Sequence, residues 1–298
     1  MGIVKPTFIV IGAMKAATTS LYTYLRQQPQ KYMPDKKEIL FFNNFQQKNN
    51  FKTLGKSKHS SMTLEEYFNF FRGAKDEIAI GEASPAYLYN IKSPELISEH
   101  LPGVKLIVIL RHPTERAYSN FLHLRKSARE KFEDFEMAID IEDKRINENW
   151  SPLYHYIRKG YYSQQLNRYY SRFPKENIKV ILFEEFINNT EETLKDLFLF
   201  LNVNPLYNVD IQKKVNIGGL PKGIIGYFIK YLKYYDLIPE KISQYVPQFV
   251  KNNILQMAYA KPEKIDENLR RNITNKYYIE EINCLQKMIG KDLTHWIS

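Results

Sequence analysis

The segment that most constrains the fold is "TFIVIGAMKAATTSLYTYL", residues 7–25. Its first part, residues 7–12, is a short continuous apolar run, which is typical of a buried parallel strand. Small residues and Lys15 follow, and we expect a helix from about residue 18 to residue 28, before Pro29. A strand that turns directly into a helix aims backbone N–H groups and the positive end of the helix dipole at one point. The segment therefore predicts an anion-binding loop.

Strand and helix patterns alternate along the rest of the chain. Further strands are predicted at about 78–81, 105–113 and 178–186. Helices are predicted near 63–71, 93–100 (with Ser93 as N-cap), 114–128, 160–174, 190–202, 222–235 and 263–289. Such alternation predicts an α/β protein with a P-loop-like three-layer fold, in which helices flank a central parallel sheet. No linker-like stretch divides the chain, so we expect a single domain over residues 1–298.

Composition limits the class of protein and the compartment that the sequence predicts. Its 44% hydrophobic residues exclude a disordered chain, and its single cysteine, Cys284, excludes an internal disulfide and fits a reducing compartment. No apolar stretch is long enough to span a membrane, and the first strand leaves no room for a signal peptide, so we expect a cytoplasmic protein. The net charge of +10 suits an anionic ligand, although a solvated lysine-rich surface would give the same balance.

The loop departs from the pattern found in ATPases. The Walker A pattern, counted from Gly12, would place its lysine at Thr18 and its Mg²⁺-binding hydroxyl at Thr19, whereas the lysine here is Lys15. The run "LIVIL" ends in Arg111 rather than in an acidic residue that could hold Mg²⁺. The sequence therefore disfavours a triphosphate site.

The loop resembles that of the sulfotransferases that use PAPS (3′-phosphoadenosine 5′-phosphosulfate). In that family the loop reads close to K-x-G-T-T/S and holds the 5′-phosphosulfate. The resemblance implies this role for Lys15, Ala16, Ala17, Thr18, Thr19 and Ser20. Ala17 stands where the family usually has glycine, and alanine tolerates that position only with a negative φ. We therefore expect a helical or near-helical φ at Ala17.

A second motif, "RHPTERAYS" (111–119), resembles the family pattern R-x-P-x-x-R-x-x-S. The resemblance implies that Arg111 and Ser119 bind the 3′-phosphate, and we expect Arg116 to be structural. An arginine at the carboxyl end of a strand suits a phosphate, because open α/β sheets bind ligands there. The family also closes over the nucleotide with a basic, glycine-containing loop, for which Lys222 and Gly223 are the candidates.

The segment "DKKEILFF" (35–42) resembles the K-E-x-x-F-F segment of heparan-sulfate and related carbohydrate sulfotransferases. The resemblance implies that Glu38 is the general base, that Lys15 stabilises the leaving oxygen, and that no metal is required. Two alternatives stay open: Glu38 is a surface carboxylate paired with Lys36 or Lys37, or a histidine is the base. We expect acceptor contacts from Lys37, Phe42, Glu82, Tyr87 and His123. The segment "KGYYSQQL" (159–166) resembles a G-x-Y helix start near the cofactor.

Together these features predict a sulfotransferase that moves a sulfonate group from PAPS to a hydroxyl or amine and leaves 3′,5′-ADP. The acceptor class would be a carbohydrate, a glycolipid or a polar natural product, with no nucleic-acid partner. One alternative is a P-loop kinase or ATPase, which the lysine position disfavours. The other is a non-catalytic basic protein that binds polyanions, for which the basic tract in residues 48–58 is short and lacks stacking aromatics.

Overall fold

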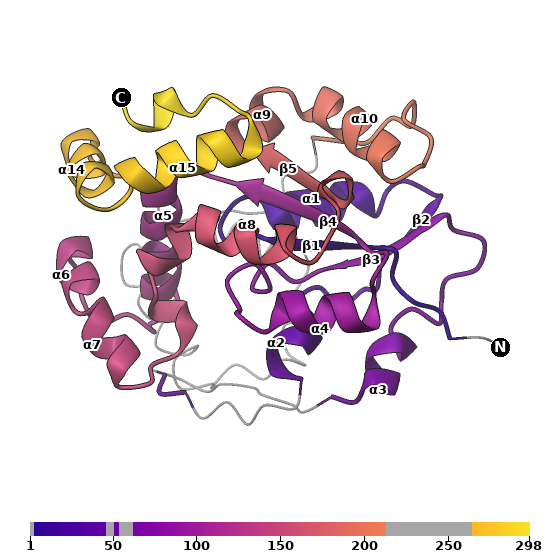
Figure 1. Ribbon diagram of the computed structural model, residues 1–298, viewed down its shortest axis with the longest axis horizontal. Coiled ribbons are helices and arrows are strands. Elements are labelled where there is room, and N and C mark those ends of the chain that lie inside the picture. Colours follow the sequence, from indigo (N-terminus) through magenta and orange to yellow (C-terminus); the bar gives the residue numbers. More distant parts are fainter. Residues whose placement is uncertain (1–2, 46–50, 54–61, 213–263) are drawn as a thin grey trace, which may run out of the picture.

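The computed structural model describes residues 3–45, 51–53, 62–212 and 264–298. In these residues five strands form one parallel sheet in the order β2-β3-β1-β4-β5 (Figure 1). The strands are β1 (Phe8–Gly12), β2 (Lys31–Tyr32), β3 (Ala79–Ala83), β4 (Lys105–Leu110) and β5 (Ile178–Leu182). The prediction of a parallel sheet is confirmed, and the two-residue strand β2 is an addition to the four strands expected.

Helices surround this sheet. In Figure 1, α4 and α8 lie in front of the sheet and α1 lies behind it. The α-helices are α1 (Thr18–Leu25), α2 (Phe41–Asn44), α3 (Leu64–Asn69), α4 (Ser93–His100), α5 (Pro113–Lys126), α6 (Phe135–Asp140), α7 (Glu142–Asn147), α8 (Tyr162–Tyr170), α9 (Phe183–Asn188), α10 (Thr190–Phe200), α14 (Glu267–Tyr277) and α15 (Ile279–Ile289). Short 3₁₀ helices are η1 (Pro152–Tyr154), η2 (Arg158–Gly160), η3 (Lys175–Asn177) and η4 (Thr294–Trp296).

The apolar runs of β1 and β4 form the centre of the core. All residues of β1 are buried, and so are Leu106 to Leu110 of β4. Full burial on both faces explains why these strands are apolar throughout rather than alternating. The helical layers on the two faces of the sheet confirm the predicted three-layer architecture.

Two of the predicted helices differ in detail from expectation. Ser93 is not the N-cap of α4: its hydroxyl donates to the Phe42 carbonyl oxygen at 3.1 Å, and the Asn90 side chain accepts from the backbone N–H groups of Lys92 and Ser93 instead. The expected last helix is two helices, α14 and α15, divided at the buried Tyr278, and α15 ends at Gly290 with a left-handed φ of 65°. The helix expected near 222–235 lies outside the described residues.

Because the strands are parallel, the segments that follow them meet at one edge of the sheet. Three backbone hydrogen bonds join these segments. The N–H of Ala13, after β1, donates to Ile109 of β4 at 2.8 Å; the N–H of Ser84, after β3, donates to Val10 at 3.0 Å. The N–H of Glu38 donates to Ala83 at 3.0 Å. This edge therefore gathers the loop after β1, the segment around Glu38 and the start of α5.

Candidate active site

The loop between β1 and α1 has an unusual backbone. Lys15 has a φ of 70° and Ala17 a φ of 60°, both in the left-handed region. The expectation of a negative φ at Ala17 was wrong. Ala17 occupies the N-cap position of α1, where the chain turns from the strand into the helix, and a left-handed residue makes that turn. Glycine adopts this conformation freely, whereas alanine pays roughly 1–2 kcal/mol for it.

This backbone predicts that Ala17→Gly stabilises the protein. We expect a gain of about 0.5–1 kcal/mol, because relief of the left-handed strain outweighs the greater freedom of glycine in the unfolded chain. The melting temperature should rise by roughly 2–3 °C in a thermal melt. Ala16→Gly is the matched control, because Ala16 is buried and its φ is not positive, so this change should lower the melting temperature. Equal losses in both variants would contradict the assignment of strain to Ala17.

Lys15 lies among charged groups from distant parts of the chain. Burial, together with the positive charges of Arg111, Arg116 and Lys126, lowers its pKa to about 8, while the carboxylate of Glu38 acts in the opposite direction. These electrostatic effects require proximity. The structure therefore brings together Lys15, Glu38 and Arg111, which sequence analysis had placed in three separate motifs.

Glu38 lies on a segment with a strained backbone. Its φ is 60°, and that of Leu40 is 59°. The hydroxyl of Ser84 accepts the Leu40 N–H at 3.0 Å, which fixes the segment to the end of β3. The Glu38 side chain is 47% exposed and accepts a hydrogen bond from Lys37 at 2.7 Å. The pairing with Lys37 that sequence analysis left open is therefore present, and the carboxylate still faces a cleft beside Lys15.

Glu82 is linked to the Glu38 segment through Ser84. It is 1% exposed, and it accepts hydrogen bonds from Tyr67 and Tyr87 at 2.9 Å and from Ser84 at 2.6 Å. Burial raises the pKa of Glu82. The Tyr87 hydroxyl also accepts the N–H of Phe42 at 3.4 Å. The expected acceptor contacts Glu82, Tyr87 and Phe42 are therefore buried behind the loop, outside the cleft lining, and their contacts position the loop instead.

The residues expected at the 3′-phosphate lie on β4 and α5. The Arg111 guanidinium donates from Nε and Nη2 to Glu115, at 3.1 and 2.8 Å, and lies 4.8 Å from the centre of the Phe183 ring. Ser119 is partly exposed on α5. Arg116 is fully buried and donates to the Tyr156 carbonyl oxygen, as a structural arginine would. Lys222 and Gly223 lie outside the described residues.

Two histidines lie near these motifs. His112 is buried, and its Nε2 lies 2.9 Å from the Trp296 carbonyl oxygen, so it belongs to the core. His123 is exposed at the protein surface, and the protein packed against it and the charge of Lys15 lower its pKa to about 4. His123 is therefore neutral at pH 7 and near Lys15, where it stays an alternative base to Glu38.

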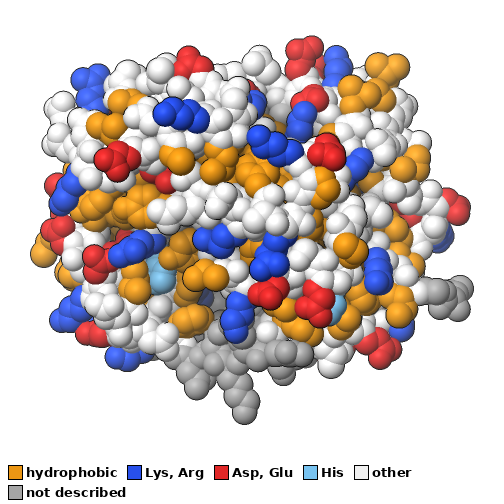
Figure 2. Space-filling view, viewed as in Figure 1, with side chains coloured by type: hydrophobic (Ala, Val, Ile, Leu, Met, Phe, Trp, Pro, Cys, Tyr) orange, Lys and Arg blue, Asp and Glu red, His pale blue; other side chains and the backbone are white. Residues whose placement is uncertain are grey.

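A cleft of about 840 Å³ opens beside the loop, a size typical of small-molecule sites. Met14 and Glu38 line its loop side, and α8 contributes Gln164, Gln165 and Arg168. Its basic lining residues are Lys92, Arg129, Arg158, Lys159 and Arg168. Glu38 is the one acidic side chain among the described residues that line it. Elsewhere, Figure 2 shows lysine and arginine side chains spread over the visible face between acidic and apolar ones, rather than gathered into one patch.

A family model described as "Sulfotransferase family" matches residues 6–206. The chain belongs to the sulfotransferase family. The matched range contains the loop after β1, the Glu38 segment and the Arg111–Ser119 motif, so the resemblance found in the sequence is confirmed. None of the described helices of this sulfotransferase has the length and apolar character that a membrane crossing needs.

Known proteins that resemble this chain are also sulfotransferases, and they match different shares of its length. The crystal structure of a sulfotransferase from Alicyclobacillus acidocaldarius matches 99% of this sulfotransferase and all of that chain, with a TM-score of 0.77 and 26% identity. Membrane-associated sulfotransferase kil1 of Dictyostelium discoideum is 24% identical, over 76% of this chain and 63% of its own length. Human heparan sulfate glucosamine 3-O-sulfotransferase 5 is 27% identical, over 67% of this chain and 54% of its own. The chain thus spans less than two thirds of these curated relatives.

Proposed function

We propose that this sulfotransferase moves a sulfonate group from PAPS to a hydroxyl or amine of an acceptor and leaves 3′,5′-ADP. The observation that carries the proposal is the convergence of three sequence motifs at the carboxyl edge of the sheet, where Glu38 and Arg111 both lie within electrostatic reach of Lys15. One cation at the helix start, one guanidinium and one carboxylate are the groups this transfer needs. We further propose that residues 1–298 form one sulfotransferase domain.

The donor side of the site fits an anionic nucleotide. Three positive charges lie close enough to Lys15 to help lower its pKa, those of Arg111, Arg116 and Lys126. The N-terminus of α1 and the hydroxyls of Thr18, Thr19 and Ser20 would hold the 5′-phosphosulfate. Arg111 and Ser119 would hold the 3′-phosphate. The Arg111 side chain is 23% exposed and paired with Glu115, so a phosphate would compete with that carboxylate for the guanidinium.

PAPS, when bound, supplies the activated sulfonate. Lys15, with a pKa of about 8, is mostly protonated at pH 7 and would stabilise negative charge that develops on the leaving oxygen. Glu38 would take the proton from the acceptor hydroxyl as that oxygen attacks sulfur, so that negative charge never accumulates on the acceptor. The cleft beside Glu38 would hold the acceptor, which we propose is a small molecule or a glycan rather than a nucleic acid.

A direct experiment tests this function. The enzyme is incubated with PAPS and a panel of sugars, glycolipids and polar natural products, and mass spectrometry detects the added sulfonate group and 3′,5′-ADP. Sulfonated product that depends on PAPS and on active enzyme supports the proposal. Phosphorylated product from Mg²⁺-ATP with the same panel would support the kinase alternative. Salt-sensitive binding of polyanions without turnover would support the non-catalytic alternative.

A further inference from the structure

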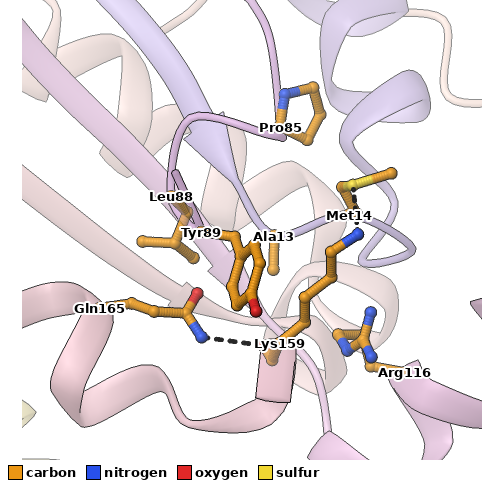
Figure 3. A pocket seen from close by; sticks show the side chains of 8 residues that line it. All are labelled: Ala13, Met14, Pro85, Leu88, Tyr89, Arg116, Lys159 and Gln165. Carbon is orange, nitrogen blue, oxygen red and sulfur yellow. Dashed lines mark hydrogen bonds between the residues drawn. The ribbon is translucent and has the colours of Figure 1, made fainter. Parts of the chain in front are cut away.

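Lys159, on η2, is a buried basic residue that lines the cleft. It is 5% exposed, and its Nζ donates to the sulfur of Met14 at 3.4 Å (Figure 3). The same nitrogen lies 5.6 Å from the centre of the Tyr89 ring. An ammonium group carries three donors, and a thioether sulfur is a weak acceptor. Among the residues that the structure describes, the contacts of Lys159 therefore leave part of its hydrogen-bonding capacity unused, in the lining of the cleft.

The charges around Lys159 favour an anion. Arg116 lines a small cavity that shares Met14, Tyr89 and Lys159 with the cleft, and its Nε and Nη1 are buried without a hydrogen-bond partner among the described residues. The Glu142 carboxylate opposes the lowering of the Lys159 pKa, but it already accepts hydrogen bonds from the N–H groups of Ile157 and Arg158, at 2.7 and 2.9 Å. Burial and the charge of Arg116 lower the pKa of Lys159 to about 7. A negatively charged ligand would offset this unfavourable burial of positive charge.

The other basic residues of the cleft are better satisfied or more exposed. Arg158 pairs with Asp143 at 2.9 Å. Arg168 donates to the carbonyl oxygens of Leu88 and Tyr89, at 3.3 and 3.2 Å. Lys92 is exposed to solvent, where an ion pair is worth little. Arg129 is only partly buried. Lys159 is thus the most buried of the basic residues that line this cleft, and an ion pair there is the least screened by water.

Neighbouring groups hold Lys159 in place. The Tyr89 hydroxyl is hydrogen-bonded to Nδ1 of His155 at 2.7 Å, and this contact fixes the ring beside the lysine. Burial and the charge of Lys159 lower the pKa of His155 to about 4, so the imidazole is neutral at pH 7. The Gln165 side chain donates to the Lys159 carbonyl oxygen at 3.1 Å. These contacts therefore fix the position of the Lys159 backbone and of the Tyr89 ring beside its side chain.

We propose that Lys159 binds a carboxylate, sulfate or phosphate group of the acceptor, and that this contact makes anionic acceptors the preferred class. The inference rests on the proposed function, because it takes the cleft beside Glu38 as the acceptor site. On binding, the ammonium exchanges its weak contact with Met14 for an anionic oxygen. The reacting hydroxyl of the same acceptor then lies toward Glu38, at the loop side of the cleft.

Two matched pairs of probes test this proposal: p-nitrophenyl glucuronide against p-nitrophenyl glucoside, and glucose 6-phosphate against glucose. Binding is measured by calorimetry or saturation-transfer NMR, with and without saturating 3′,5′-ADP. We expect at least one anionic member to bind about tenfold more tightly than its neutral partner, as a charged hydrogen bond allows. Lys159→Met should remove this preference, and Lys159→Arg should restore part of it. Lys92→Met, which removes an exposed charge from the same cleft, should change it less than about twofold.

A stability measurement shows whether the test variant folds. Lys159→Met should keep or raise the melting temperature, because methionine has a similar length and brings no charge into the interior. The folded-state pKa of Lys159 lies below its unfolded value, so the unfolded chain binds more protons between about pH 7 and pH 10. The wild type should therefore gain stability relative to Lys159→Met as the pH rises through that window.

The outcomes separate this inference from the proposed function. An anionic preference that survives in folded Lys159→Met overturns the role of Lys159. Failure of both anionic probes to bind more tightly than their neutral partners overturns the anionic acceptor class. Failure of 3′,5′-ADP to bind counts against the proposed function instead, and a Lys159-dependent preference seen without nucleotide would still establish the anion site.

Discussion

Lys15→Ala should lower the rate of sulfonate transfer by at least about 10²–10³-fold, because it removes the cation that would stabilise the leaving oxygen. The fold should survive, because the lysine is a partly buried charge whose pKa burial has already lowered to about 8. The measurements are single-turnover transfer from PAPS and a thermal melt of the same preparation. Retained turnover in a folded Lys15→Ala protein would contradict the catalytic role of the lysine.

The pH dependence of nucleotide binding gives a second test of Lys15. Its positive charge is lost as the pH rises through about 8, so the affinity of the wild type for 3′,5′-ADP should fall above that pH. Bound phosphate raises the pKa of Lys15 in the complex. The pH at which the affinity begins to fall is therefore set by the pKa of Lys15 in the free enzyme. Lys15→Ala should show weaker binding throughout and little of this pH dependence. The same fall above pH 8 in both proteins would assign the titration to another group.

Glu38→Gln should lower turnover by about 10²–10⁴-fold, the usual contribution of a general base, and keep the binding of 3′,5′-ADP. Glutamine preserves the size of the side chain and the backbone of the segment, which the bonds from Glu38 to Ala83 and from Leu40 to Ser84 hold. Because the Glu38 carboxylate raises the pKa of Lys15, the variant should be assayed well below pH 8, so that loss of the carboxylate does not also deprotonate Lys15. Calorimetry with 3′,5′-ADP and transfer from PAPS are the two measurements.

Two further variants separate the roles left open for Glu38. If the carboxylate were only the partner of Lys37, then Lys37→Met and Glu38→Gln would both change stability by less than about 1 kcal/mol and leave turnover unchanged. If His123 were the base, His123→Gln would abolish turnover while Glu38→Gln would not. Loss of turnover in Glu38→Gln alone is the result that the proposed mechanism requires.

The parts of the fold that the sequence predicted are those that local pattern determines. The continuous apolar runs of β1 and β4 are buried on both faces, which is the environment that such runs predict in a parallel sheet. Parallel strands then bring Lys15 and Arg111 to the same edge of the sheet without any knowledge of side-chain packing. The place of Glu38 beside them was implied only by the resemblance to carbohydrate sulfotransferases, because Glu38 follows no predicted strand.

The parts that the sequence did not predict depend on contacts between distant segments. Glu82 is buried where Tyr67 of α3 and Tyr87 donate hydrogen bonds to it. The residues "GEASP" alone do not indicate where α3 packs. Ser84, which links Glu82 to the Glu38 segment, was missed for the same reason. The left-handed φ of Ala17 depends on how sharply the chain must turn after β1. The burial of Lys159 beside Met14 likewise appears only in three dimensions.

Calorimetric binding of 3′,5′-ADP in the presence of a metal chelator tests the central claim most directly, with Mg²⁺-ATP as the competing ligand. The account predicts that 3′,5′-ADP binds without metal, that Lys15→Ala and Arg111→Met weaken this binding, and that Mg²⁺-ATP binds much less tightly. Tight binding of Mg²⁺-ATP, abolished by the chelator and accompanied by no binding of 3′,5′-ADP, would contradict it.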